Sequence, residues 1–594
     1  MGRSISTNGK KYHSRLTYVH LSRPLAVQPE YKYSPIMEVA GLALGTISLF
    51  PIVLELFRTV TSLSGFAETS VILFLQLDLE REVLSRWGRE VGLCRENNGS
   101  GSNCLIPSDL LPVVHEIIAA IGYLLAEATS VDDRPPRTGG NASTLDEALR
   151  ILRSKIEQQR TIGIPLRQAY RRLRWAIFKE AQLRELIDDI HKYNNGLHNL
   201  VPKPVQARLD GLLLQAILSN RDRAGLEEIR EASRGLRGDL SAAADVILLR
   251  ESPEIVPHPS TADLMLSRSG FPFINKDMSR CLTTYRRKIG REVKELHVMV
   301  EWRGYKCESN TERKQRFLAT CLDLARLLHA SQNLAAYRTM DCLGILDDVE
   351  FMPNHRIGLV YRAPVNMAAT ASRSPGSASV QVRTLQDLIN DQETQYPDLG
   401  QRFELAQSLS VALHRILVSR WFHKNMNSRN VLFFKENGTI SVVNPFLSGF
   451  DYARPNSPEQ ETIKPDQDEF SDRYRHPRYT DPATRQEIRY SQSFDIYSLG
   501  VLLVEIGYWE TVESIQKRKL RHGKKHATTS PLRDLQRHLS TKCIDSLVFR
   551  MGKVYANATK FCLSRGDSST ECEEEHLLKL FNSDVVSELA KCNA

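Results

Sequence analysis

The stretch HKNMNSRNVLF at residues 423–433 gathers polar side chains of the types that take part in acid–base and metal chemistry. Three of them, Asn425, Asn427 and Asn430, are carboxamides. A carboxamide cannot take up a proton near neutral pH, and its single oxygen is a poor ligand for magnesium. The stretch therefore supplies neither a general base nor a metal-binding carboxylate, and its meaning depends on what surrounds it.

Further motifs stand in a fixed order around this stretch. A predicted helix over 400–421 precedes it, with leucines spaced along one face. The motifs that follow are LSGFDYARP (447–455), YRHP (474–477), FDIYSLGVLLVEI (494–506) and MGKVYANATKFCL (551–563). Together these motifs resemble a protein kinase, and the resemblance covers most of 270–594. It implies an α+β fold, which agrees with the strand-like runs ELHVMVEW (295–302) and RIGLVYRAP (356–364) ahead of the helices.

The residues that phosphotransfer requires are absent from the positions that the resemblance assigns to them. Asn425 stands where the kinase family has its aspartate base, and Asn427 stands where it has a lysine. Gly449 replaces the metal-binding aspartate, and Glu301 stands where a lysine would hold the phosphates, so that its charge would repel them. No G-x-G-x-x-G loop precedes that strand. The resemblance therefore implies a pseudokinase rather than an enzyme, with no metal and no cofactor expected, although nucleotide binding is left open.

The residues that persist have packing roles in the kinase family. By resemblance, His423 and Phe450 belong to an internal hydrophobic spine, and Asp495 caps the backbone of the 423–430 turn. An alternative is an atypical active kinase that uses Asp451 as a substitute metal ligand, or Glu301 in an unusual role. The losses at separate positions disfavour this alternative.

Composition and length place limits on the rest of the chain. The 594 residues are 41% hydrophobic and 25% charged, which is typical of a globular protein with several domains. The net charge of +9 is compatible with anionic membranes, and we expect no nucleic-acid partner. The ten cysteines form no C-x-x-C pair and no zinc-site spacing, so we predict reduced thiols and no structural metal.

The first half of the chain has helical periodicity and no strand-like alternation, which predicts an all-α bundle. The uncharged run VAGLALGTISLFPIVL (39–54) is too short for a secure transmembrane helix and is interrupted by Pro51. We predict that it is a buried core helix at rest. The expected organisation is a basic, disordered arm at 1–36, a helical domain at 37–250, a Pro-rich linker at 251–264 and the kinase-like domain at 265–594.

The helical half resembles the HeLo domain of fungal cell-death and heterokaryon-incompatibility proteins, a family also described by prion inhibition and propagation. The resemblance rests on MEVAGLALGTISLF (37–50), LDLEREVLSRWGREVGL (77–93) and residues 171–202. Trp87 and Trp175 lie in its most specific stretches and are expected to pack in the core. The family implies that an apolar N-terminal helix is held back at rest and enters membranes on activation. The candidate membrane-inserting residues are Val39, Leu42, Leu44, Ile47, Leu49, Phe50, Ile52 and Val53.

Two functions remain open from the sequence. The first is a cell-death effector that is cytoplasmic at rest and acts at the plasma membrane when an upstream receptor or self-association activates it. The second is a cytosolic pseudokinase scaffold that binds protein partners only. Three smaller features are a possible myristoylation pattern at the start (MGRSIS), a basic run in an expected loop at 516–526, and possible phosphorylation of Ser457 or Thr462.

Overall fold

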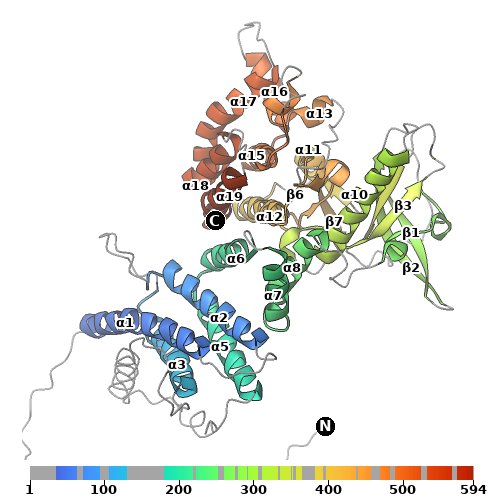
Figure 1. Ribbon diagram of the computed structural model, residues 1–594. Helices are drawn as coiled ribbons and strands as arrows, with labels where there is room; N and C mark the ends of the chain where they lie inside the picture. The colour runs from blue at the N-terminus through green and yellow to red at the C-terminus, as the bar shows by residue number, and fades with distance from the viewer. Residues whose placement is uncertain are drawn as a thin grey trace, which may run out of the picture.

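The computed structural model describes two regions of the chain, an N-terminal helical region and a C-terminal α+β region (Figure 1). The described residues are 35–62, 71–93, 106–129, 180–218, 222–251, 260–274, 279–289, 292–304, 311–331, 335–348, 351, 356–363, 382–391, 396–436, 439–456, 468–481, 488–522, 531–564 and 571–592. Trp175, Ser457, Thr462 and residues 1–34 lie outside them.

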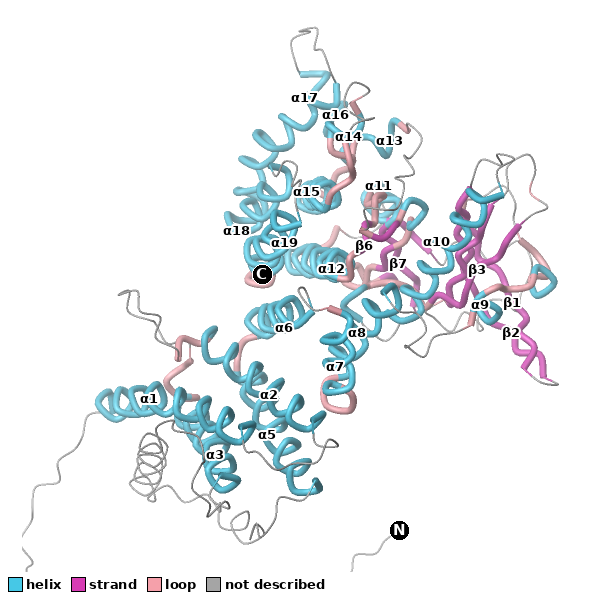
Figure 2. Tube along the Cα trace, in the orientation of Figure 1, coloured by secondary structure: helices cyan, strands magenta, loops and turns pink. Residues whose placement is uncertain are grey.

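The described part of the N-terminal region is entirely helical, as the periodicity predicted (Figure 2). Its helices are α1 (Pro35–Ser62), α2 (Val71–Glu90), α3 (Leu111–Thr129), α5 (Glu180–Leu200), α6 (Lys203–Leu218), α7 (Arg223–Ser233) and α8 (Gly238–Glu251). Helix α1 packs on α2 and α3, and α2 also packs on α5 and α7. The expectation that Pro51 interrupts the apolar run was wrong, because α1 continues through it. Pro51 lies on the exposed side of α1, where water can hydrogen-bond the carbonyl that the proline leaves unpaired.

A buried carboxylate joins three helical segments of this region. Glu80 on α2 is fully buried and receives a bidentate ion pair from Arg237, with both distances 3.0 Å. It also bonds the His191 ring at 2.9 Å and accepts the Asn194 amide at 2.7 Å, both from α5. Burial alone raises the pKa of Glu80, but the hydrogen bond from His191 and the charge of Arg237 outweigh it, and the net pKa is lowered. The network therefore fixes α2, α5 and the α7–α8 turn in one arrangement.

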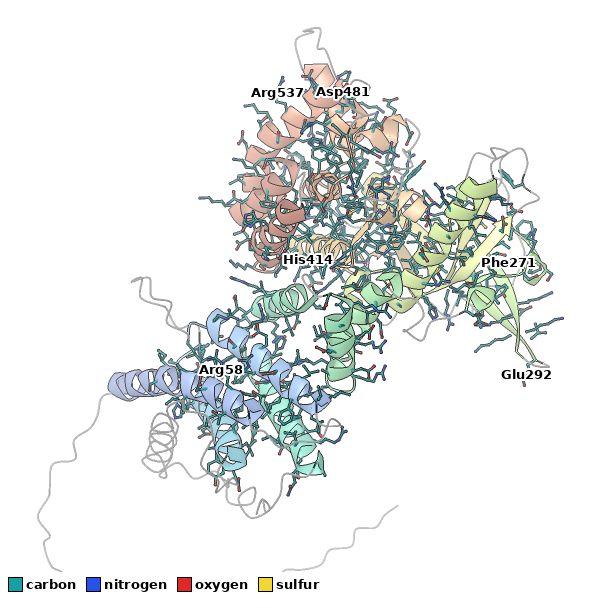
Figure 3. The ribbon with its side chains drawn as sticks, viewed as in Figure 1. Arg58, Phe271, Glu292, His414, Asp481 and Arg537 are labelled. Atoms are coloured by element: carbon teal, nitrogen blue, oxygen red, sulfur yellow. The ribbon has the colours of Figure 1, made fainter. Side chains whose placement is uncertain are left out.

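The C-terminal region opens with a small lobe built on an antiparallel sheet in the order β1-β2-β4-β3. Its elements are α9 (Thr261–Leu264), η3 (Arg268–Gly270), β1 (Arg280–Ile289), β2 (Glu292–Gly304), α10 (Thr311–Ala330), η5 (Ala335–Tyr337), β3 (Cys342–Asp348) and β4 (Arg356–Arg362). Helix α10 packs on β3. The outer ends of β1 and β2 project as a hairpin, with Glu292 at its tip (Figure 3). Strands β2 and β4 match the predicted strand-like runs, whereas β1 and β3 were missed.

The large lobe is mainly helical around the fully buried helix α15 (Gln492–Tyr508). Its first elements are β5 (Val382–Thr384), α11 (Leu385–Asn390), α12 (Leu399–Val418), β6 (Trp421–Phe422), η7 (Ser428–Asn430), β7 (Val431–Glu436), β8 (Thr439–Ile440), β9 (Phe446–Leu447), η8 (Phe450–Tyr452) and β10 (Arg454–Pro455). Its later elements are α13 (Glu469–Asp472), α14 (Pro477–Thr480), α16 (Val512–His522), α17 (Pro531–His538), the π-helical turn η9 (Leu539–Cys543), α18 (Ile544–Ser564), α19 (Glu571–Phe581), the π-helical turn η10 (Asn582–Val586) and α20 (Ser587–Leu589).

Two sequence expectations are changed or left open here. The basic run 516–526 was expected in a loop, but its described part, 516–522, is the end of α16. An i,i+4 ion pair between Glu513 and Lys517, at 2.6 Å, supports the helix there. The linker at 251–264 stays a prediction. Within it, Ser260 starts α9 with a capping box, and Leu264 is buried in the C-terminal core.

The two regions meet through α6 and α8. Helix α8 packs on α10, and α6 packs on η10 and α20. Val246 of α8 is part of the hydrophobic core of the C-terminal region, and Gly211 of α6 lies against the side chain of Asn582. Among the described contacts, α1 packs within its own bundle rather than on the C-terminal region.

Candidate functional site

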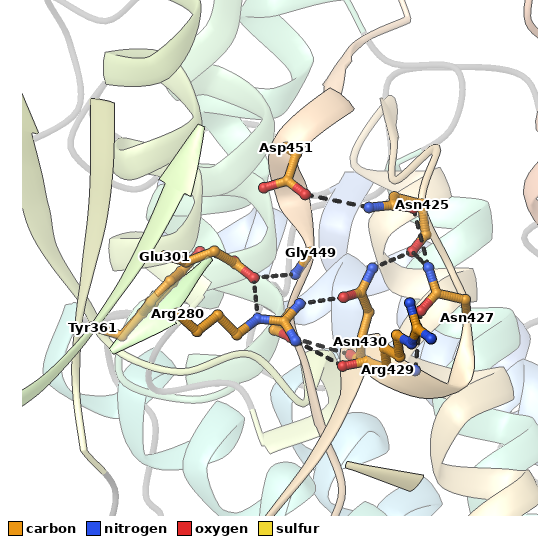
Figure 4. Close-up of polar contacts among 10 residues, drawn as sticks. Arg280, Glu301, Tyr361, Asn425, Asn427, Arg429, Asn430, Gly449 and Asp451 are labelled. Atoms are coloured by element: carbon orange, nitrogen blue, oxygen red, sulfur yellow. Dashed lines mark hydrogen bonds and ion pairs between the residues drawn. The ribbon is translucent and has the colours of Figure 1, made fainter. Parts of the chain in front are cut away.

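The sequence-predicted kinase-motif residues gather around a cleft between the small and large lobes (Figure 4). The cleft has a volume of about 290 Å³. On one side its walls come from the start of β1 and the C-terminal end of β2. On the other side they come from the 423–430 turn, the residues after β9, and α13 with the residue before it. The predicted residues that line it are Glu301, Asn425, Asn427, Asn430 and Asp451.

Arg280, which the sequence analysis missed, neutralises Glu301 at the mouth of this cleft. The two residues are direct cross-strand partners on β1 and β2, and Arg280 Nε lies 2.6 Å from Glu301 Oε1. Glu301 is 2% exposed and also accepts the backbone N–H of Gly449 at 2.9 Å. The carboxylate of Glu301 is therefore already paired, and the expected repulsion of phosphates stays a prediction. The strand register could have revealed Arg280 once the hairpin was recognised.

Arg280 also joins the two lobes across the cleft. It donates to Asn430 Oδ1, and its Nη1 donates to the Arg429 carbonyl at 2.7 Å. Asn430 in turn donates its amide to the Asn425 carbonyl at 2.7 Å. Both ends of the Asn430 side chain are thus engaged within the protein, and Asn430 Oδ1 is paired with a cation rather than directed to a metal ion.

The polar wall opposite Arg280 includes carboxamides and the carboxyl groups of Asp451 and Asp468. Asn425 donates to Asp451 Oδ2 at 3.3 Å, and Asn427 donates to Asn425 Oδ1 at 3.1 Å. Burial, followed by the charge of Glu301, raises the pKa of Asp451 to about 7. No cluster of three or more histidine, cysteine, aspartate or glutamate side chains suited to a metal occurs in the described ranges. The carboxyl groups that line the cleft are those of Glu301, Asp451 and Asp468.

Gly449 has a backbone conformation that favours glycine and a close neighbour that leaves no room for a Cβ atom. Its backbone is left-handed, with φ 78° and ψ 37°. A Cβ atom added there would lie 2.1 Å from Asn430 Nδ2 and 2.2 Å from Asn430 Cγ. A carboxylate cannot be placed at this position unless the backbone and Asn430 both move. The absence of an aspartate at 449 is thus part of how the cleft is packed.

The residues expected to have scaffold roles are buried beneath the turn. Asp495 is fully buried and accepts the backbone N–H groups of His423, at 2.9 Å, and Lys424, at 2.8 Å. The Tyr490 hydroxyl donates to the same carboxyl group at 2.7 Å. Burial raises the pKa of Asp495 to about 6. The His423 ring packs on Phe450, with centroids 4.6 Å apart, so these residues hold the turn without facing a substrate.

The second candidate site is the apolar face of α1. Ile47 and Ile52 are half-buried, whereas Leu49, Phe50 and Val53 are fully buried in the bundle core. The side chains of Val39, Leu42 and Leu44 lie outside the described residues. The opposite face of α1 is exposed at Ser48, Pro51, Glu55 and Arg58. Helix α1 is therefore amphipathic, with its apolar face directed into its own bundle.

Close contacts lock this apolar face against α2. A Cβ atom at Gly88 would lie 2.1 Å from the Phe50 ring, so the ring packs directly on the glycine backbone. The neighbouring Trp87 is buried and donates its indole N–H to the Leu197 carbonyl at 3.0 Å. The stretch Arg86-Trp87-Gly88 therefore joins α1, α2 and α5 in a single packing unit.

Helix α3 contributes an apolar partner for α1 that the sequence analysis did not single out. Thr46 on α1 and His115 on α3 share a buried hydrogen bond of 2.9 Å. In the described part of the chain, Leu111–Ala128 is the helix segment long and apolar enough to cross a membrane by length and composition. Its mean hydropathy is 1.5 and 44% of it is buried, which a soluble core helix also satisfies.

Comparison with known families assigns the helical region. Residues 41–229 match the family model of the HeLo domain, described as prion-inhibition and propagation. The match runs from α1 into α7 and covers the packing unit of Phe50, Trp87 and Gly88. The match supports the HeLo resemblance of the N-terminal helical region. No curated protein matches the chain.

Proposed function

We propose that this protein is a fungal cell-death or incompatibility effector whose HeLo region acts at membranes under the control of a kinase-like region that transfers no phosphate. The observation that carries the proposal is the apolar face of α1, whose core residues from Leu49 to Val60 are buried inside a region that matches the HeLo family. The protein is cytoplasmic at rest in this proposal and moves to the plasma membrane when a receptor or self-association activates it.

The energetics of α1 favour release into lipid rather than into water. Burying one large apolar side chain stabilises a protein by about 1.5–3 kcal/mol. The core residues that α1 contributes are Leu49, Phe50, Val53, Leu56, Phe57 and Val60. Exposing all of them to water would cost about 9–18 kcal/mol, which is comparable to the whole stability of a domain. Release therefore needs a second apolar environment, and a bilayer supplies one.

Control by the C-terminal region would act through α6 and α8, since these helices make the contact between the regions. Arg415 on α12 is buried there, and burial lowers its pKa while the charges of Asp210 on α6 and Asp239 on α8 raise it. A shift of the large lobe would remove this attraction and loosen α6 and α8. Because α6 also packs on α2, loosening it would reach the helix against which Phe50 is packed.

The cleft supports a regulatory rather than a catalytic role. Asn425 cannot act as a base, and Gly449 cannot be replaced by a metal-binding aspartate in this packing. Arg280 already fills the junction between the lobes. We expect the purified protein to transfer no phosphate above background. Phosphotransfer that disappears in an Asp451→Ala variant would instead favour the atypical-kinase alternative.

Liposome leakage tests the membrane proposal directly. The fragment 37–250, checked for folding by circular dichroism, should release the contents of anionic vesicles and kill cells that express it. Ile47→Arg should abolish leakage, because a charge within an inserted helix costs about 2.5–3.5 kcal/mol on insertion scales. Ser48→Glu is the gentler variant, because Ser48 is exposed and the change leaves the core intact.

The scaffold alternative has a distinct outcome in the same experiment. A folded fragment that causes neither leakage nor toxicity, but still captures a specific protein partner, would contradict the membrane proposal. The apolar face of α1 would then be an ordinary part of the core.

A further inference from the structure

The surface of α18 presents an aromatic ring to solvent in an otherwise well-packed lobe. Phe549 is 94% exposed, and its neighbour Val548 is 44% exposed. Leu547, directly before this pair, and Met551, two residues after it, are buried in the core. The helix is therefore firmly anchored, and Phe549 projects from it at a fixed position. An exposed large apolar side chain in this setting is typical of an interaction site when it is joined by other features.

Three cations without ion-pair partners stand close to this ring in the sequence. Lys542, Arg550 and Lys553 are exposed, and no ion pair in the described part of the chain involves any of them. Arg550 follows Phe549 directly, Lys542 lies in η9 before α18, and Lys553 follows the non-helical Gly552, while the exposed acid on α18 is Asp545. We call Lys542, Phe549, Arg550 and Lys553 the α18 patch.

Helix α16 adds further basic residues at the edge of the patch. The guanidinium of Arg550 lies 4.8 Å from the centre of the Tyr508 ring, and that of Arg518 lies 5.8 Å from the same ring. Burial lowers the pKa of His538, and the charges of Lys519, Arg518 and Lys542 lower it further. These cations from α16 and η9 therefore converge beside the patch. Arg518 is paired with Glu510, so the patch itself supplies the uncompensated charge.

The backbone explains why Phe549 stands clear of the lobe. Gly552 interrupts α18 with φ 84° and ψ 165°, a conformation that essentially only glycine adopts, and no atom lies within 4 Å of the Cβ that it lacks. The first segment of the helix therefore ends just after Met551, and the chain turns away. Phe549 lies in the last turn before this break, together with Arg550.

We propose that the α18 patch is a docking site for an anionic lipid surface. Its positive charge complements anionic headgroups, and the projecting Phe549 ring gains burial when it enters the headgroup region. A convex helix with a ring that is 94% exposed suits a broad, deformable surface better than it suits a single acidic peptide. The proposal goes beyond the membrane action of the HeLo region, because it places a second contact on the C-terminal region that does not require α1 to move.

Vesicle flotation with the full chain tests this docking site. The wild-type protein should float with phosphatidylcholine vesicles that contain phosphatidylserine and much less with phosphatidylcholine alone, and binding should weaken as salt is raised. Phe549→Ser should weaken binding by about tenfold. The double variant Arg550→Ala, Lys553→Ala should weaken it by about 25-fold, because each cation near an anionic surface contributes about fivefold.

Matched variants on the small lobe provide the controls. Phe273 is 69% exposed, and Arg287 is exposed on β1, so Phe273→Ser and Arg287→Ala remove similar groups from another surface. These variants should keep the wild-type affinity, and all variants should keep the wild-type melting temperature. Binding that is insensitive to both α18 variants, or equally sensitive to the controls, would overturn the proposal.

Two further readouts distinguish lipid docking at the α18 patch from peptide binding there and from membrane insertion of α1. A polyglutamate peptide that binds through Phe549 and Arg550, while vesicles do not bind, would identify an acidic-peptide site and refute the lipid assignment. Leakage reports on α1, whereas flotation of the resting full chain reports on the α18 patch. If Ser48→Glu abolishes leakage but the protein still floats with the vesicles, the docking site at the α18 patch is supported. If leakage is retained and flotation does not change in Phe549→Ser, the docking site is refuted.

Discussion

The packing of Gly449 makes a quantitative prediction about placing a side chain at this position of the cleft. An alanine at 449 would keep a left-handed backbone, which costs a residue with a Cβ atom roughly 1–2 kcal/mol. The new Cβ atom would also lie 2.1 Å from Asn430 Nδ2, and such overpacking typically costs about 1–3 kcal/mol. Gly449→Ala should therefore destabilise the C-terminal region by about 2–5 kcal/mol.

A double-mutant cycle separates these two contributions. Asn430→Ala removes the group that the new Cβ atom would meet, so in that background Gly449→Ala should destabilise the protein only through the left-handed backbone. The double variant should thus be more stable than the sum of the single effects predicts, by about 1–3 kcal/mol. Urea unfolding followed by tryptophan fluorescence measures these differences, since Trp302, Trp421 and Trp509 lie in the C-terminal region. Additive effects of the two substitutions would refute the steric argument.

The same reasoning applies to an attempted reversion of the motif. Asn425→Asp with Gly449→Asp should yield no magnesium-dependent rise in melting temperature, because the second aspartate cannot take its place beside Asn430. A stable double revertant that binds magnesium would show that the loop adapts freely, and the packing account of Gly449 would fail.

Three further predictions concern buried groups elsewhere in the fold. Asp495→Asn should destabilise the C-terminal region by about 1–3 kcal/mol and lower its melting temperature, because an amide cannot accept hydrogen bonds from all three donors. Asp545→Asn, at an exposed position, is the control and should have no effect. Equal losses of stability in the two variants would contradict the capping role of Asp495. Gly88→Ala should destabilise the HeLo region by about 1–3 kcal/mol, and Phe50→Leu should rescue part of this loss if the ring is the obstacle. The pKa of Glu80 is lowered from 4.5 in the folded state, so its ionised form stabilises the protein above pH 4.5 and this stabilisation is lost as the pH falls through the folded-state pKa. In Glu80→Gln, the free energy of unfolding should therefore depend less on pH below 4.5, as followed by circular dichroism. An unchanged acid transition would refute this.

The predictable part of the fold is the part with a strong apolar pattern. The leucine stripe of α12 and the apolar runs of β2 and β4 led to correct elements, because their burial follows their hydrophobic spacing. Strand β1 was missed since its outer half is exposed and carries charged residues, which leaves no alternation to detect. The end of α12 was placed too late because Arg420, with φ 58°, reverses the chain without a glycine signal.

The sequence could predict which motif residues lie near the cleft, but not how the charged groups there are paired. Motif order placed Asn425, Asn430 and Gly449 in the cleft region, since motifs are read along the chain. The role of Arg280 depends on the strand register that sets it opposite Glu301, and register is a property of the folded sheet. The contact between Gly449 and Asn430 likewise depends on a left-handed backbone that the sequence only permits.

The contact between the two regions combines apolar packing with buried polar groups that lack hydrogen-bond partners. Asn582 is fully buried against Gly211, and neither of its side-chain polar atoms has a hydrogen-bond partner in the described structure. An unsatisfied buried amide costs about 1–3 kcal/mol, and this cost is relieved when the regions separate and water reaches the group. Arg415, whose Nε and Nη1 also lack partners, gains hydration by the same movement. The apolar packing of Val246 opposes this relief, so the closed state is held by hydrophobic contact and opposed by buried polar groups. Such a balance allows a modest binding energy at the C-terminal region to shift the contact, which is the property that the proposed control of the HeLo region requires.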